Sequence, residues 1–214
     1  MRTTDARNIY LLLLEHYPDA RNSPTTLGRG TPFVVLVLTI LSAQTTDRAV
    51  LLVKKSLFSK FKTPSALANA NIPDVEKIIH SLGFYHAKAR HIIAAARMVV
   101  SEFGGTVPST MEGLLKLPGV GRKTANIVLY HALGKNEGIA VDTHVRRLAQ
   151  RIGFSSFNDQ DRIEQDLMRL FPQDWWGDLT DVLIAHGRAC CIAKKPRCDR
   201  CPISRYCRYF RISG

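Results

Sequence analysis

Residues 117–126 read LPGVGRKTAN, and this stretch places a glycine turn between two segments of helical character. The second segment covers residues 122–133 and ends at Gly134, because glycine readily adopts the left-handed conformation that closes helices. Gly119 and Gly121 allow a tight turn whose backbone N–H groups can approach a phosphate, helped by the positive end of the following helix. The stretch therefore predicts two helices joined by a phosphate-binding turn, with a plain connecting turn as the alternative.

Lys123 lies in the first turn of this second helix, where the helix dipole disfavours a positive charge. The position favours the neutral amine, which is the form that attacks carbon. The turn itself resembles the helix-hairpin-helix motif, which grips the DNA backbone without reading base sequence. Two interpretations of Lys123 stay open, a nucleophile and a lysine that only contacts phosphate or solvent.

The rest of the chain has the periodicity of short amphipathic helices. Residues 33–40 form the only β-rich stretch, and nothing nearby alternates or turns like a partner strand, so we predict a buried helix there. One helical face recurs at Ala89, Ile92, Ile93, Ala96, Val100 and Phe103, before Gly104 and Gly105 end the segment. The pattern predicts an all-α protein of about ten short helices.

Several polar residues have the positions of helix starts. Thr63 precedes Pro64, and residues 71–73 (NIP) have the same character. Asn158 precedes an acidic first turn and is expected to cap the helix that follows. Ser109 and Glu112 have the three-residue spacing of a capping box.

Length and composition are those of a folded globular protein. The chain has 214 residues, of which 45% are hydrophobic and 22% charged, enough for a sizeable core in one or two domains. The longest apolar run, residues 33–41, is about half as long as a membrane-spanning helix requires. The N-terminal residues lack the cleavage site of a signal peptide. We therefore expect a cytoplasmic protein with no membrane partner.

The chain is strongly basic, which suits a polyanionic partner. Lys and Arg number 30 against 18 Asp and Glu, a formal net charge of +12. Residues 188–211 contain eight basic side chains and one acidic side chain, a net charge of +7. The excess is therefore concentrated in a C-terminal basic segment, and a merely solvated surface is the less favoured interpretation.

A carboxylate begins another predicted helix. Asp142 precedes apolar residues at helical spacing, namely Val145, Leu148, Ala149 and Ile152, and Gly153 follows as a stop. Asp142 is therefore a natural N-cap, and capping alone accounts for it. A carboxylate in that position can also stabilise positive charge that develops nearby. His144, two residues further on, is expected to be structural.

Four cysteines fall within 17 residues at 6-2-5 spacing: Cys191, Cys198, Cys201 and Cys207. A disulfide framework does not suit an odd total of five cysteines in a cytoplasmic chain. Structural zinc usually uses two Cys-x-x-Cys pairs, whereas only Cys198 and Cys201 are that close here. The wider loops favour a cubane iron-sulfur cluster over zinc. Cys190 lies outside the pattern and is expected to be a buried thiol.

Taken together, these motifs resemble the endonuclease III family of DNA glycosylases, within the helix-hairpin-helix superfamily. The matching stretches are residues 41–47 (LSAQTTD), 83–89 (GFYHAKA), 117–126 (LPGVGRKTAN), 140–145 (AVDTHV) and 186–188 (HGR), together with the cysteine spacing. The resemblance covers most of the chain, and the combination is highly specific.

The resemblance implies an all-α fold of two lobes with DNA held in the cleft between them. One lobe would comprise residues 25–136 with the hairpin. The other would join residues 1–24 to residues 137–214 and carry a 4Fe-4S cluster at residues 191–207, with Cys191, Cys198, Cys201 and Cys207 as ligands. The implied protein is a monomer that acts near the nucleoid on duplex DNA containing damaged bases or abasic sites.

The resemblance also implies a bifunctional mechanism. A damaged pyrimidine, expected to be an oxidised one, would be flipped from the duplex, which costs least for a poorly stacked base. Lys123 would attack C1′ of the sugar, expel the base and form a Schiff base. Asp142 would assist deprotonation of the lysine and stabilise the cationic sugar. β-Elimination would then cut the strand 3′ to the abasic site.

The family pattern assigns DNA contacts to three further regions. Gln44 would fill the gap left by the flipped base. SLGFYHAKA departs from the family's commoner GLYNSKA, so Leu82 and Phe84 are both candidates for the opposite wedge, with His86 beside them. The hairpin would contribute Gly119, Val120, Gly121, Arg122 and Thr124, and the loop between the first two cysteines would contribute Lys194, Lys195 and Arg197.

Three other functions are compatible with parts of the pattern. Adenine glycosylases share the hairpin and cluster but commonly lack a lysine at the position of Lys123, so they fit less well. An archaeal mismatch thymine or uracil glycosylase is the enzymatic alternative, because such proteins share the scaffold and differ mainly in the base pocket. A non-catalytic DNA-binding module is the alternative from another class, and Lys123 together with Asp142 argues against it.

Overall fold

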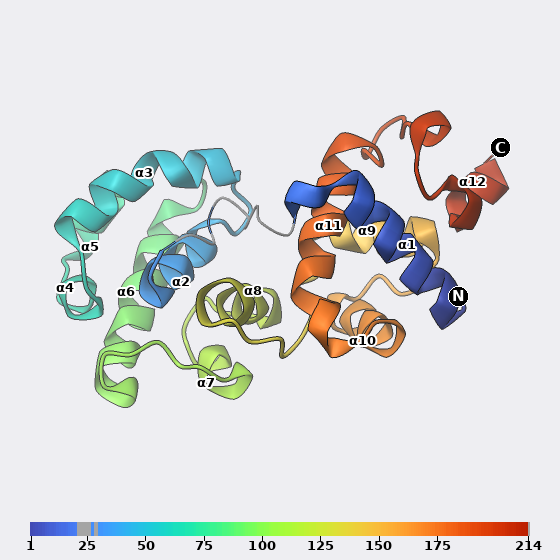
Figure 1. The fold of residues 1–214 in the computed structure, drawn as a ribbon. Helices are drawn as coiled ribbons and strands as arrows, with labels where there is room; N and C mark the ends of the chain where they lie inside the picture. Colours follow the sequence, from blue (N-terminus) through green and yellow to red (C-terminus); the bar gives the residue numbers. More distant parts are fainter. Residues whose placement is uncertain (21–26, 28–29, 214) are drawn as a thin grey trace. The chain divides into compact units, whose positions relative to one another are not determined.

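The computed structural model describes residues 1–20, 27 and 30–213, and this part of the chain contains helices and loops but no β-strand (Figure 1). The α-helices are α1 (Thr3–His16), α2 (Pro32–Leu41), α3 (Asp47–Lys60), α4 (Pro64–Ala68), α5 (Ile72–Ile79), α6 (Tyr85–Phe103), α7 (Met111–Leu115), α8 (Arg122–Leu133), α9 (Thr143–Ile152), α10 (Gln160–Leu170), α11 (Trp176–Ala189) and α12 (Arg208–Ser213). Short 3-10 turns are η1 (Pro18–Ala20), η2 (Gln173–Trp175), η3 (Cys198–Arg200) and η4 (Ser204–Tyr206). The all-α fold predicted from the sequence is confirmed.

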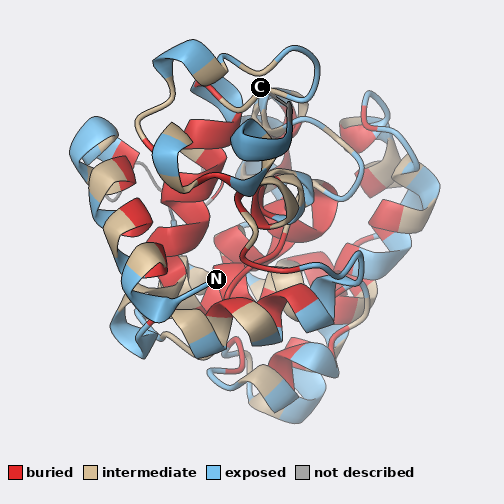
Figure 2. Ribbon diagram, turned by 90° about the vertical axis from the view of Figure 1, so that its right-hand side faces the viewer, coloured by how far each residue is buried: buried red, intermediate tan, exposed pale blue. Residues whose placement is uncertain are grey.

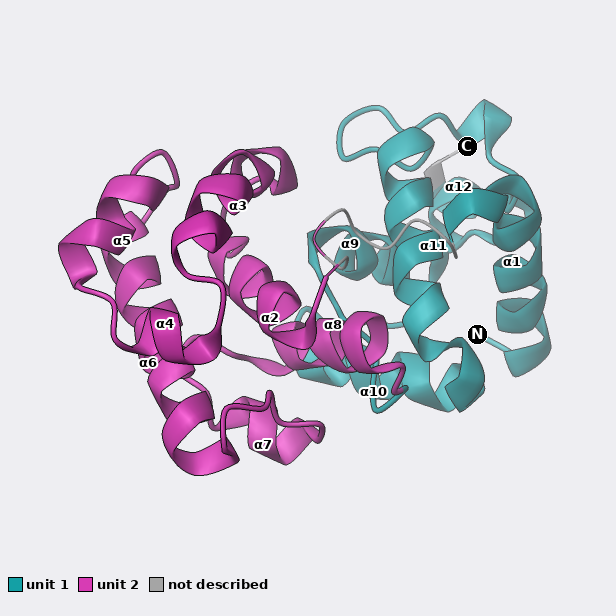
Figure 3. Cartoon of the chain, turned by 60° about the vertical axis from the view of Figure 1, so that its left-hand side comes forward, with its two compact units in different colours: residues 1–24, 136–214 teal, residues 25–135 magenta. Residues whose placement is uncertain are grey.

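The chain divides into two compact units (Figure 3). Unit 1 comprises residues 1–24 and 136–214, and unit 2 comprises residues 25–135. The boundary expected at residues 24 and 25 lies outside the described residues. Unit 2 contains α2 to α8 with the glycine turn, whereas unit 1 contains α1, α9 to α12 and the cysteines.

Helix α2 is the buried centre of unit 2. It packs against α3, α6 and α8, and its residues from Val35 to Leu41 are all buried. The one polar residue among them, Thr39, donates its hydroxyl to the Val35 carbonyl at 2.7 Å, so burial leaves no unpaired donor there. The helix expected over residues 33–40 is therefore confirmed, because a stretch that is apolar on every side suits a helix surrounded by other helices.

Helix α11 has the same central place in unit 1, where it packs against α1 and α9. Most helices show one buried side and one exposed side (Figure 2). The unit 1 core includes Ile9, Leu13, Val145, Leu148, Ile163, Leu167, Val182 and Leu183. Truncating one of its leucines or isoleucines to alanine costs about 2–5 kcal/mol, so this core holds α1, α9, α10 and α11 together.

Two predicted helix caps are wrong by one residue. Asp159, not Asn158, caps α10 by accepting from the Arg162 N–H at 3.0 Å, while the Asn158 side chain accepts from Gln150 at 2.6 Å. Thr110, not Ser109, caps α7. In each case two adjacent residues are both good caps, and a tertiary contact engages the first of them; Ser109 accepts from Lys135.

The starts at Thr63 and Asn71 are confirmed, since α4 and α5 begin directly after them. The long amphipathic helix ends at Gly104 as expected, in the left-handed conformation. Within the described residues, no helix has both the length and the apolar character needed to cross a membrane.

Candidate catalytic and iron-sulfur sites

The glycine turn joins α7 to α8 and leaves the start of α8 open. Gly119 has a φ of +79°, and a Cβ there would lie 3.0 Å from the Cβ of His91, so only glycine suits both the conformation and the space. The Val120 N–H closes the turn on the Leu117 carbonyl at 3.1 Å. The N-cap residue of α8 is Gly121, which has no side chain to offer the first-turn N–H groups. The turn is therefore suited to bind an anion through the backbone.

Lys123 is the second residue of α8, directly after this turn, and it is half-buried. Arg122 and Thr124 on either side of it are also half-buried. From Ala125 onward α8 is buried for five residues, and it packs against α2. A rigid helix therefore holds the amine next to the anion-binding backbone.

Asp142 begins α9 as predicted, in unit 1. Its Oδ1 accepts from the Val145 N–H at 2.7 Å, and its backbone carbonyl accepts from Arg146 at 2.9 Å. The side chain is half-buried. Because the cap uses Oδ1 alone, Oδ2 takes no part in it, and one carboxylate can combine a structural with a chemical role.

His144 packs against the end of α11 and belongs to the scaffold. Its Nδ1 lies 3.2 Å from the Arg147 guanidinium, and burial lowers its pKa. Arg147 also donates to the Gly187 carbonyl at 3.0 Å. A Cβ at Gly187 would lie 2.9 Å from His144 Nδ1. This contact explains why residue 187, the second residue of the HGR stretch at 186–188, is glycine.

The four cysteines of the 6-2-5 pattern line one cavity in unit 1: Cys191, Cys198, Cys201 and Cys207. They lie between the end of α11 and the start of α12, with η3 and η4 between them. Largely apolar neighbours complete the lining, among them Ile152, Ile203, Tyr209 and Phe210. The arrangement brings together all four predicted ligands.

The chemistry of these thiols suits a cationic group. Burial raises the pKa of Cys201 to about 12 and also raises the pKa of Cys198. Such thiols keep their protons unless a metal supplies compensating positive charge, and a coordinating thiol is deprotonated outright. Four half-buried or buried thiols around one small, mostly apolar cavity therefore fit a cubane cluster.

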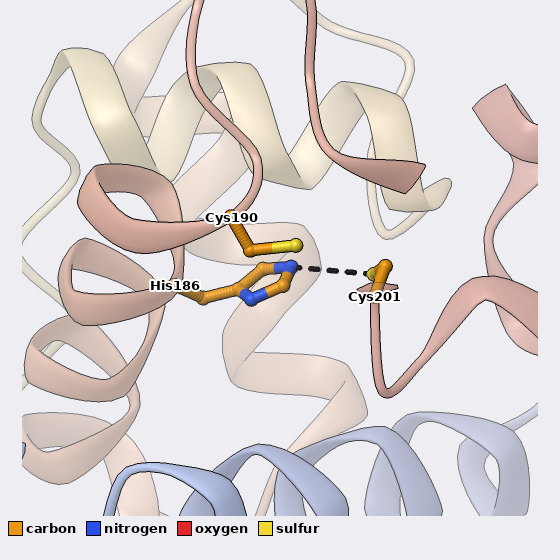
Figure 4. Close-up of side chains that lie close together, drawn as sticks. All are labelled: His186, Cys190 and Cys201. Carbon is orange, nitrogen blue, oxygen red and sulfur yellow. Dashed lines mark hydrogen bonds between the residues drawn. The ribbon is translucent and has the colours of Figure 1, made fainter. Parts of the chain in front are cut away.

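A second group of possible ligand atoms overlaps this set. His186, Cys190 and Cys201 place one ring nitrogen and two sulfurs within 4.8 Å of one another (Figure 4). Cys190 is buried, as expected, and its thiol donates to the Arg197 carbonyl at 3.3 Å. Sequence reasoning gave His186 no role, although its position five residues before Cys191, in the last turn of a helix, could have indicated one.

Two arginines of α9 hold the loop between Cys191 and Cys198. Arg147 donates to the Cys191 carbonyl at 3.0 Å, and Arg151 donates to the carbonyls of Ile192 and Ala193 at 2.8 Å each. This loop carries Lys194, Lys195 and Arg197, all of them exposed. Helix α9, which Asp142 caps, is thus bonded to the basic loop. Sequence reasoning did not identify either arginine.

Two of the three predicted gap and wedge residues, Gln44 and Phe84, occupy strained, exposed positions in unit 2. Gln44 and Phe84 have φ values of 51° and 58°, rare for residues other than glycine. Phe84 is 69% exposed, whereas Leu82 is 1% exposed. The buried Lys88 amine donates to the Thr45 hydroxyl, which ties α6 to the loop that carries Gln44. Burial lowers the pKa of Lys88.

His86 lies in the first turn of α6 and is exposed. Its Nδ1 is 2.8 Å from a Glu76 carboxylate oxygen. The residue is thus held against α5, two positions after Phe84.

Comparison with known proteins agrees with this geometry. Residues 37–173 match a family described as HhH-GPD superfamily base excision DNA repair protein, and residues 191–207 match the iron-sulfur binding domain of endonuclease III. Endonuclease III of Synechocystis is 48% identical over 94% of this chain and 91% of its own length, and endonuclease III of Escherichia coli is 40% identical over 87% and 88%. The chain belongs to the endonuclease III family.

As a member of the endonuclease III family, the protein is a bifunctional DNA glycosylase and abasic-site lyase of base excision repair, it acts on duplex DNA and it carries a 4Fe-4S cluster. The iron-sulfur match begins at Cys191 and ends at Cys207. A solved structure of a trapped endonuclease III–DNA covalent intermediate superimposes with a TM-score of 0.91, at 36% identity over 100% of this chain and 99% of that one. A thermostable thymine-DNA glycosylase, at 24% identity and a TM-score of 0.84, shares the fold.

Proposed function

We propose that the protein removes oxidised pyrimidines from duplex DNA through a Schiff base at Lys123 and then cuts the strand on the 3′ side. The observation that carries the proposal is the position of Lys123, in the first turn of a helix that follows an anion-binding glycine turn. The backbone that grips a phosphate and the amine that attacks the neighbouring sugar are thus two residues apart.

In the first stage, the Lys123 amine attacks C1′ of the damaged nucleotide, the glycosidic bond breaks, and the base leaves with its bonding electrons and takes up a proton. Asp142 accepts a proton from the attacking amine and stabilises positive charge on the sugar. The sugar ring then opens, with O4′ taking a proton, to give the Schiff base.

In the second stage, a proton leaves C2′ and the 3′ phosphate departs with the electrons of its C–O bond. Water then hydrolyses the Schiff base and regenerates the amine. The glycine turn holds the DNA during both stages by donating backbone N–H groups to phosphate oxygens. Gly119, Val120, Gly121, Arg122 and Thr124 are the residues of this contact, in which Val120 shapes the turn because its N–H bonds the Leu117 carbonyl.

Gln44 fills the gap left by the flipped base, and Phe84 is the opposite wedge. Phe84 is mostly exposed and can enter a duplex, whereas Leu82 is buried in the core of unit 2 and supports the loop from beneath. His86, held by Glu76, lies beside the wedge. An aromatic side chain between base steps stacks on either neighbour, so the wedge tolerates any surrounding sequence.

The four cysteines of the 6-2-5 pattern hold the 4Fe-4S cluster, which when bound fixes the loop between Cys191 and Cys198. Lys194, Lys195 and Arg197 then contact DNA phosphates and position the duplex without reading bases. The protein works in the cytoplasm as a monomer on nucleoid DNA.

A panel of duplexes tests this function. Wild-type protein should cut duplexes that contain an oxidised pyrimidine and duplexes that contain an abasic site, and should leave a thymine–guanine mismatch intact. Lys123→Ala should cut none of them. Lys116→Ala is the matched control, because it removes an exposed lysine of the same hairpin, and it should cut like wild type. Preferential cutting of the mismatch would contradict the assigned substrate, and cutting by Lys123→Ala would contradict the assigned nucleophile.

A further inference from the structure

His186 lies beside Cys201, one of the cavity cysteines (Figure 4), and it also contacts a tyrosine hydroxyl. Its side chain is 1% exposed in the last turn of α11. Nδ1 lies 3.1 Å from the Tyr17 hydroxyl oxygen, and Nε2 lies 3.6 Å from the Cys201 sulfur. Tyr17 follows α1 directly, so these contacts join the first helix of the chain to the cysteine segment. None of the functions assigned above uses either residue.

The direction of both hydrogen bonds follows from the chemistry of a metal ligand. A cysteine that binds iron is a thiolate and can only accept, so the proton between the imidazole and Cys201 belongs to Nε2. Nδ1 of a neutral imidazole is then an acceptor, and the Tyr17 hydroxyl donates to it.

We infer that Tyr17 and His186 form a hydrogen-bond relay that stabilises the reduced state of the cluster through the Cys201 sulfur. A hydrogen bond to a ligand sulfur withdraws electron density, which favours the more negative oxidation state. The Tyr17 hydroxyl fixes the imidazole tautomer and ring orientation, as outer partners of metal ligands generally do. Both are positioning residues, and the inference rests on the proposed assignment of Cys201 as a ligand.

Three variants of the intact iron-loaded protein separate the parts of the relay. His186→Leu removes the donor to sulfur, His186→Gln can keep an N–H donor near the Nε2 position, and Tyr17→Phe removes only the hydroxyl. The measurement is the midpoint potential of the cluster's one-electron couple by protein-film voltammetry. We expect His186→Leu to make the midpoint potential more negative by up to about 59 mV, which corresponds to about a tenfold change in the redox equilibrium constant. Tyr17→Phe should shift it less in the same direction, and His186→Gln least.

Tyr209→Phe is the matched control. Tyr209 lines the same cavity, but in the described part of the chain its hydroxyl has no hydrogen bond to a cysteine, so its removal should leave the potential unchanged. An unchanged potential in all three relay variants would overturn the inference, as would a shift in Tyr209→Phe equal to that in Tyr17→Phe. If His186→Leu fails to load iron, Tyr17→Phe and His186→Gln decide the question.

Failure of the underlying ligand assignment has a different signature. Cys201→Ser should lose iron and the visible absorption of the cluster, whereas the relay variants should retain both. A Cys201→Ser protein with a full iron content would refute the ligand assignment, and with it the route through sulfur. If the relay variants leave the midpoint potential unchanged while Cys201→Ser loses iron, the relay is refuted, but the ligand assignment and the glycosylase function stand.

Discussion

The two helices that carry the proposed catalytic residues begin in opposite ways. Helix α8 has Gly121 as its N-cap, which offers no side chain to the first-turn donors, and Lys123 lies in that first turn, where the dipole disfavours a cation. Helix α9 begins at Asp142, whose carboxylate closes its own first turn at 2.7 Å. The start of α8 therefore gives up helix stability in exchange for phosphate binding and a reactive amine. At the start of α9, the single carboxylate of Asp142 both stabilises the helix and takes part in the reaction.

The largest expected effect concerns Lys123. Lys123→Ala should abolish cutting, because the nucleophile is gone, and should leave the free energy of unfolding unchanged or raise it by up to about 1 kcal/mol. Strand-cutting assays and thermal unfolding of the same preparations check this. A marked loss of stability would mean that the lysine supports the fold, contrary to the comparison.

Asp142 should behave differently, and two substitutions separate its roles. Asp142→Asn keeps a good cap, so it should slow base excision by about 100- to 10,000-fold, the usual scale of general acid–base assistance, with stability nearly unchanged. Asp142→Ala should lose the same activity and about 1 kcal/mol of stability as well. Single-turnover excision and denaturant unfolding measure the two effects. Equal stabilities of the two variants would show that the cap contributes little.

The basic loop binds DNA by charge, whereas the start of α8 binds it through the backbone. Reversing Lys194 and Lys195 to Glu should weaken binding to all duplexes alike and reduce the slope of log K against log salt by about two. Fluorescence anisotropy at several salt concentrations checks this. A changed ranking of lesions with an unchanged slope would mean that the loop reads bases.

The smallest expected effect comes from giving α8 an aspartate N-cap like that of α9. A Cβ at Gly121 meets no atom within 4 Å, so Gly121→Asp is accommodated and its carboxylate can cap α8. The variant should gain a few tenths of a kcal/mol in stability and bind duplex DNA more weakly, because the carboxylate occupies the donors and repels phosphate. Gly121→Ala controls for size and should bind better than Gly121→Asp. Equal binding by both variants would exclude a backbone phosphate contact.

Local patterns in the sequence predicted the helices, the open start at Gly121, the cap at Asp142 and the cysteines that share a cavity. The helix features depend on residues within one or two turns of each other, and the cysteines fall within 17 residues, which explains the success. The caps at Asn158 and Ser109 were wrong because tertiary contacts engage those side chains and the neighbouring residue caps instead. The burial of Leu82 and the Tyr17–His186 contact depend on chain segments far apart in sequence, and no local pattern encodes them.

The central claim is that Lys123 bonds covalently to the sugar. Borohydride reduction of wild-type protein with an abasic duplex, followed by proteolysis and mass spectrometry, identifies the residue that carries the sugar. The account predicts one modified peptide with the adduct on Lys123, and no adduct in Lys123→Ala although that variant still binds the duplex. An adduct on another amine, such as the N-terminus, or an undiminished adduct in Lys123→Ala would contradict the claim.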